Sequence, residues 1–137
     1  MSAATGLATA LTDANSGSDS NLDIAGRRVM ICEDEPLIAF DIASGVEELG
    51  GEVLGPFAAV CEALAALDRH LPDLALLDVN LIDGDVTPVL LRLVAARVPV
   101  VVNTGTRLPE EAVDLGVPVF LKPTDPSELI AAVVGLR

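Results

Sequence analysis

The sequence predicts an α/β fold in which a parallel sheet of five strands is covered by helices on both faces. From residue 28 onward, short apolar runs alternate with amphipathic stretches, and Gly, Pro or Asp marks the ends of these segments. When each strand is followed by a helix, the crossovers make the strands parallel and lay the helices on the sheet. A length of 137 residues with 51% hydrophobic residues suits one such three-layer domain.

Five apolar runs indicate the strands. They are VMIC (29–32), EVLG (52–55), LALL (74–77), PVVVN (99–103) and VPVFL (117–121). Each run is short, rich in Val, Ile or Leu, and bounded by polar or turn-forming residues, which is typical of strands buried on both faces.

Five further segments have the signals of helices. They are residues 36–49, 58–68, 87–96, 109–115 and 126–136. Pro36 and Pro88 fall in the first turn of their helices, where a missing amide proton costs nothing, and Gly50 follows the first helix. Asp83 and Asp85 are expected to cap the next helix along the chain.

Residues 1–26 are rich in small and polar residues and have no sustained helix or strand period, so we predict a flexible tail before a folded domain at 27–137. The start of the chain lacks the features of a signal peptide, and no stretch reaches the roughly 18 apolar residues of a membrane span. We therefore expect a cytoplasmic protein, and no output domain after Leu136.

The charge balance argues against several functions. With 21 acidic and 8 basic residues, the net charge of −13 disfavours binding to nucleic acid or to an anionic membrane surface. Cys32 and Cys61 lie in apolar segments without the spacing of metal ligands, so we predict that both are buried and reduced.

Carboxylates gather where the predicted strands end. Glu33, Asp34 and Glu35 follow the first strand, and Asp78 follows the third. The carboxyl ends of parallel strands meet at one edge of the sheet, so these like charges would destabilise one another unless a cation offsets them. Carboxylate oxygens are the ligands that Mg²⁺ prefers. We expect a Mg²⁺ site here, with Glu35 outside it because Glu35 begins the helix at Pro36.

The same edge is predicted to hold groups that bind an anion. Lys122, the only lysine in the chain, follows the fifth strand, and Thr104 and Gly105 follow the fourth. An ammonium group, a hydroxyl and an open backbone N–H around Asp78 would form a receptacle for a phosphoryl group on that carboxylate. Positioning and charge neutralisation are what phosphoryl transfer requires of a protein.

From residue 28 to its end, the sequence resembles a receiver domain of the two-component response regulators, whose fold is flavodoxin-like. The matching motifs are the acidic pair in CEDEP, the aspartate of LLDVN, the threonine of NTG and the lysine of LKP. The resemblance implies that Asp78 accepts the phosphoryl group, that Lys122 pairs with its oxygens, and that Thr104 donates a hydrogen bond to it.

The resemblance also implies a set of magnesium ligands. Asp34 and Asp78 would bind Mg²⁺ directly and Glu33 directly or through water, with the main-chain carbonyl of Asn80 as the remaining protein ligand. One position departs from the common pattern, because Val119 stands where many receivers carry Tyr or Phe. Phe120 is adjacent, but it should point to the opposite face of its strand.

We therefore predict a single-domain response regulator that is phosphorylated by a sensor histidine kinase or a histidine phosphotransfer protein. It would signal by binding a downstream protein or act as a phosphate sink, and it would catalyse only its own phosphorylation and dephosphorylation. Two alternatives stay open at this stage. One is a Mg²⁺-dependent phosphatase of the dehalogenase-like class, although Asn80 stands where that class carries a second acid. The other is an interaction module of the same fold that works without phosphorylation.

Overall fold

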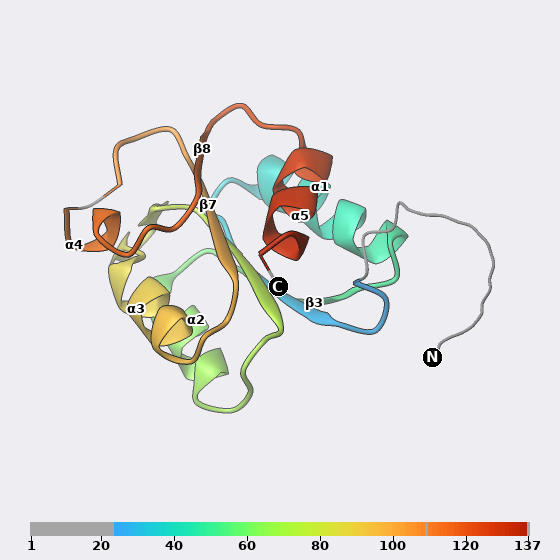
Figure 1. Cartoon of the computed structure of the whole chain (residues 1–137), viewed down its shortest axis with the longest axis horizontal. Helices are drawn as coiled ribbons and strands as arrows, with labels where there is room; N and C mark the ends of the chain where they lie inside the picture. The colour runs from blue at the N-terminus through green and yellow to red at the C-terminus, as the bar shows by residue number, and fades with distance from the viewer. Residues whose placement is uncertain (1–23, 109, 137) are drawn as a thin grey trace.

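The computed structural model describes residues 24–108 and 110–136, which form a sheet between two layers of helices (Figure 1). All five strands of the main sheet are parallel, in the order β3-β2-β4-β7-β8. Their bounds are β2 (Arg28–Cys32), β3 (Glu52–Phe57), β4 (Leu74–Leu77), β7 (Val100–Thr104) and β8 (Val119–Leu121). The predicted α/β fold is confirmed, and its strand order is that of flavodoxin-like proteins.

The helices divide between the two faces of the sheet. The helices α1 (Pro36–Glu48) and α5 (Pro126–Val134) pack together on one face, and α2 (Val60–Leu67), α3 (Thr87–Ala95) and α4 (Glu110–Val113) lie on the other (Figure 1). The last of these is a single turn, shorter than the segment predicted at 109–115, and Pro109 lies outside the described residues.

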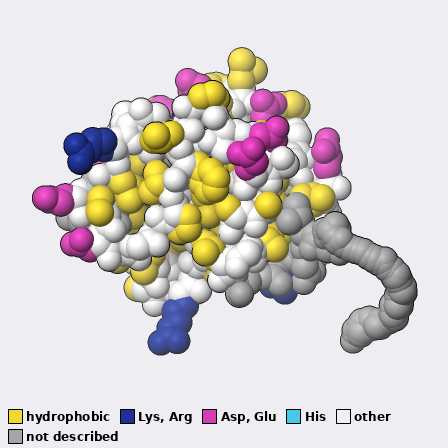
Figure 2. Space-filling view, turned by 45° about the horizontal axis from the view of Figure 1, so that its top comes forward, with side chains coloured by type: hydrophobic (Ala, Val, Ile, Leu, Met, Phe, Trp, Pro, Cys, Tyr) yellow, Lys and Arg dark blue, Asp and Glu magenta, His cyan; other side chains and the backbone are white. Residues whose placement is uncertain are grey.

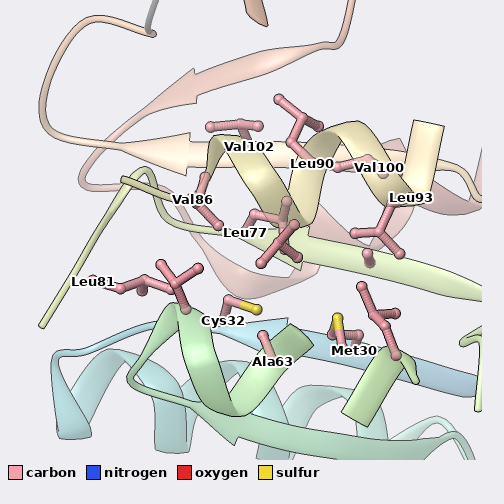
Figure 3. Packing of buried hydrophobic residues seen from close by; sticks show 14 of the residues in the cluster. Met30, Cys32, Ala63, Leu77, Leu81, Val86, Leu90, Leu93, Val100 and Val102 are labelled. Carbon is pink, nitrogen blue, oxygen red and sulfur yellow. The ribbon is translucent and has the colours of Figure 1, made fainter. Parts of the chain in front are cut away.

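Two apolar cores hold the layers together, one on each face of the sheet. Along β7, Val100 and Val102 belong to the core under α2 and α3, whereas Val101 belongs to the core under α1 and α5. Figure 3 shows Val100 and Val102 with Leu90 and Leu93 of α3 in the first of these cores. The strands therefore read as nearly continuous apolar runs, because both of their faces are buried.

The folded part of the chain begins no later than Ile24. This residue was assigned to the tail, but its side chain is fully buried in the core under α1 and α5. The amide of Gly26 also donates to the carbonyl of Gly50. Residues 1–23, the rest of the predicted tail, lie outside the described part of the chain. No helix among the described residues is long and apolar enough to cross a membrane.

A small hairpin between β4 and α3 was not predicted. Its strands are β5 (Asn80–Leu81) and β6 (Gly84–Asp85). Asp85 accepts a hydrogen bond from the amide of Thr87 at the start of α3, as expected. Asp83 instead accepts from the amides of Val60 and Cys61 at the start of α2, so the prediction that it caps the next helix is wrong. The hairpin turns Asp83 back toward α2, and the sequence separation between Asp83 and Val60 at the start of that helix is 23.

The two cysteines also differ from one another. Cys32 is buried in β2, and burial raises the pKa of its thiol to about 12. Cys61 is exposed, so the prediction that both cysteines are buried is wrong for this residue. The apolar face of α2 is formed by Val60, Ala63, Ala66 and Leu67, which turns position 61 toward solvent.

Candidate functional site

The pairing of the strands brings the predicted site residues together at the carboxyl edge of the sheet. Cys32 pairs with Leu77, so Glu33 and Asp78 follow residues that are already opposite each other. Asp78 extends this alignment, because its amide donates to the carbonyl of Cys32 at 2.8 Å. Ligands of parallel α/β sheets bind at this edge, where the strand order reverses on either side of the first strand.

The same geometry places the lysine. Thr104 pairs with Leu121 in the last two strands, and the amide of Lys122 donates to the carbonyl of Thr104 at 2.9 Å. The Lys122 ammonium group then reaches back across the edge of the sheet. Its Nζ lies 3.0 Å from Glu33 Oε1 and 3.1 Å from Asp78 Oδ2.

This ion-paired cluster is largely withdrawn from solvent. The side chains of Glu33, Asp78 and Lys122 are 2%, 7% and 19% exposed. Burial of Lys122 works to lower its pKa, but its hydrogen bonds to Glu33 and Asp78 outweigh this effect and raise the pKa above its ordinary value. The lysine is therefore charged at neutral pH and partly neutralises the two buried carboxylates.

The buried carboxyl group of Glu33 has a pKa well above its ordinary value. Desolvation of its buried carboxyl raises the pKa from 4.5 to about 7, although hydrogen bonds from the Glu35 amide and from Lys122 act in the opposite direction. The Glu35 amide donates to Glu33 Oε2 at 3.1 Å, while the Glu35 side chain is exposed. The cost of burying this carboxylate is not fully offset by its hydrogen bonds and by Lys122. The site can therefore accommodate a further cation.

The acidic cluster fits a divalent metal ion. One carboxylate oxygen from each of Glu33, Asp34 and Asp78 can be chosen so that all three lie within 4.8 Å of one another. Three carboxylates oppose the single ammonium group of Lys122, so the site keeps an excess of negative charge. Hard oxygen ligands with this charge suit Mg²⁺, whose remaining positions are usually filled by water.

Thr104 and Gly105 occupy the adjacent strand end as predicted. The Thr104 side chain is fully buried, and Gly105 is exposed. A Cβ at position 105 would meet nothing within 4 Å, so the backbone there is open to an approaching group. The loop that follows therefore combines a buried hydroxyl with accessible main chain.

Thr106 was missed by the sequence interpretation. Its hydroxyl lies 3.2 Å from that of Thr104 and accepts a hydrogen bond from the Asn80 side chain at 2.9 Å. Asn80 itself is exposed. The repeated threonine in TGTR was the available signal, because Ser and Thr side chains frequently bond to groups two residues away.

The side chains of β8 alternate between the two faces of the strand, as predicted for Val119 and Phe120. Val119 is 40% exposed, while Phe120 points to the opposite face and packs on the core under α1 and α5. Phe120 therefore does not replace the missing ring. Leu121, on the same side of the strand as Val119, is 70% exposed.

Comparisons with known proteins agree with this arrangement. A family model for the response regulator receiver domain matches residues 29–134. The transcriptional regulatory protein PdtaR of Mycobacterium tuberculosis is 37% identical over 112 residues, which cover 78% of this chain and 55% of PdtaR. The structure of SdrG from Sphingomonas melonis has a TM-score of 0.67 and 33% identity, and the match covers 80% of this chain and 97% of SdrG.

A second structure, that of the response regulator PhyR from Brucella abortus, has a TM-score of 0.64 and 36% identity over 84% of this chain and 49% of PhyR. The chain thus spans about half the length of PdtaR and of this PhyR. The fold, the site and the matches define a signalling domain of two-component systems. The chain belongs to the response regulator receiver family.

Proposed function

We propose that this chain accepts a phosphoryl group on Asp78 from a phosphohistidine of a sensor kinase or a histidine phosphotransfer protein. One observation carries the proposal: the Lys122 ammonium group is bound to Asp78 and Glu33 at the carboxyl edge of the sheet. A buried carboxylate held by a lysine beside two further carboxylates has the charges needed to receive a phosphoryl group and its metal ion.

In the transfer, a carboxylate oxygen of Asp78 forms a bond to phosphorus as the nitrogen–phosphorus bond of phosphohistidine breaks. The imidazole nitrogen leaves with the bonding electron pair and takes up a proton. Lys122 already lies 3.1 Å from Asp78 Oδ2, so its ammonium group needs only a short movement to pair with a phosphoryl oxygen. In dephosphorylation, water attacks phosphorus, the Asp78 carboxylate leaves, and inorganic phosphate is released.

Glu33, Asp34 and Asp78 are the side chains that would hold Mg²⁺. By the resemblance to receiver domains, the main-chain carbonyl of Asn80 would be a further ligand. When bound, the ion supplies positive charge that neutralises the phosphoryl oxygens. The protein side chains orient the acceptor. Thr104 and Gly105 complete the receptacle, because their hydroxyl and backbone N–H can each donate to a phosphoryl oxygen.

The phosphorylated chain would then bind a downstream protein or drain phosphoryl groups from its kinase. Its chemistry would be confined to its own phosphorylation and dephosphorylation. An acidic surface favours a protein partner over nucleic acid, since the net charge is −13 and Figure 2 shows Asp and Glu side chains spread around an apolar area.

Intact-mass spectrometry after incubation with acetyl phosphate and MgCl₂ tests the proposal. The parent should gain the mass of one phosphoryl group, whereas Asp78→Asn should gain none, and chelation of the metal should prevent the gain in the parent. Asp114→Asn, at an exposed aspartate beyond α4, is the matched control and should behave as the parent. A phosphoryl gain in Asp78→Asn would show that the acceptor is another residue.

A further inference from the structure

The hydroxyl of Thr104 is already engaged in this structure. Its oxygen accepts a hydrogen bond from the Thr106 amide at 3.1 Å and lies 3.2 Å from the Thr106 hydroxyl oxygen. The Thr106 hydroxyl in turn accepts from the Asn80 side chain at 2.9 Å. A chain of polar contacts therefore runs from the end of β7 to the β5–β6 hairpin.

The difference in burial between Thr104 and Thr106 indicates which hydroxyl donates in the contact between them. Either hydroxyl could donate across the contact between the two threonines. If Thr106 donated, the proton of Thr104 would lack a hydrogen-bonding acceptor among the described residues, and Thr104 is fully buried. A buried donor without an acceptor is costly. With Thr104 as the donor, the remaining proton belongs to Thr106, which is exposed and can bond to water.

We propose that Thr106 is a positioning residue that holds the Thr104 hydroxyl proton until Asp78 is phosphorylated. This inference rests on the proposed function. A phosphoryl oxygen accepts hydrogen bonds and cannot donate them at full ionisation, so Thr104 can bond to it only by giving up its donation to Thr106. The phosphoryl group and Thr106 therefore compete for one proton, and the Asn80 side chain supports the resting arrangement by holding Thr106.

The competition can be measured with beryllofluoride, which in the presence of Mg²⁺ mimics the phosphoryl group on the acceptor carboxylate. Thr106→Val keeps the backbone amide and a similar shape but removes the hydroxyl. It should bind beryllofluoride about two- to tenfold more tightly, because the resting state loses one hydrogen bond of ordinary net strength. Thr106→Ser restores the hydroxyl and should return the affinity to that of the parent.

Thr87→Val is the control for removing a threonine hydroxyl elsewhere. The Thr87 hydroxyl bonds to Asp85 at the start of α3, and this variant should leave the beryllofluoride affinity within twofold of the parent. Affinity in Thr106→Val that equals or falls below that of the parent would overturn the inference.

A measurement without ligand separates this inference from the proposed function. In the metal-free protein, three-bond NMR couplings should report one χ1 rotamer for Thr104 in the parent and in Thr106→Ser, and averaged rotamers in Thr106→Val. An unchanged single rotamer in Thr106→Val would overturn the inference. If the parent gains no phosphoryl mass and takes up no beryllofluoride, the proposed function fails, while these couplings still decide whether Thr106 holds Thr104.

Discussion

The Lys122 ammonium group lies 3.0 Å from the Glu33 carboxylate, although 89 residues separate them along the chain. Glu33 follows β2, an inner strand of the sheet, whereas Lys122 follows the edge strand β8. Because β4 and β7 lie between these two strands, the contact joins the two sides of the site across the ends of β4 and β7. Because Asp78 shares the same ammonium group, the charge state and the stability of the site depend on Lys122.

Replacement of the lysine should destabilise the metal-free protein. Lys122→Met leaves two buried carboxylates without their counter-charge, and we expect a loss of about 3–5 kcal/mol in the free energy of unfolding at pH 7.5. Urea denaturation measures this loss. Arg92→Met is the matched control, since Arg92 pairs with Asp68 at 3.0 Å on the surface and such pairs contribute little. Equal losses in the two variants would contradict the assignment of Lys122.

The stability of the metal-free protein should depend on the protonation of Glu33. Its pKa is about 7 in the folded protein and near 4.5 when unfolded, so between these values the folded state binds more protons. Stability then falls as pH rises from 4.5 through 7, by about 1–3 kcal/mol in total. Thermal unfolding in EDTA at pH 5.0 and 7.5 measures this fall.

Glu33→Gln provides the comparison for that experiment. An amide does not titrate, so the variant should lose most of the decrease in stability between pH 5.0 and 7.5. A decrease of the same size in Glu33→Gln would assign the effect to another group.

Asp34→Asn should stabilise the metal-free protein and weaken its affinity for Mg²⁺. The substitution removes one of three clustered carboxylates, and Asp34 is only partly buried. We expect the melting temperature in EDTA to rise by about 2–5 °C, which corresponds to roughly 0.5–1 kcal/mol. Asp41→Asn, at an exposed position of α1, should change neither quantity. An unaltered Mg²⁺ titration of Asp34→Asn would exclude Asp34 as a direct ligand.

Activation should act on the loop after β7 rather than on Val119. A valine is short and stiff at χ1 and cannot swing between buried and exposed positions as an aromatic ring can. Addition of beryllofluoride and Mg²⁺ should therefore move backbone NMR signals mainly in residues 104–116. Thr104→Ala should shrink these shifts while phosphorylation of Asp78 persists, and Val119→Ala should alter them little. Shifts concentrated in α5, with residues 104–116 silent, would refute this route.

The sequence by itself was sufficient for the fold class and for the list of residues at the carboxyl edge of the sheet. Apolar runs followed by helices force parallel strands, and parallel strands bring the residues that follow them to one edge. Glu33, Asp78 and Lys122 could be placed together on this ground, because each directly follows such a run.

The contacts that only the tertiary structure decided join segments far apart in the chain. Asp83 caps α2 rather than the following helix because the β5–β6 hairpin folds back. Ile24 is buried because its side chain packs in the core under α1 and α5. The link from Asn80 through Thr106 to Thr104 likewise depends on how the hairpin meets the loop after β7. Local patterns report the periodicity of one segment, whereas the partner of a loop side chain is set by the packing of other segments against it.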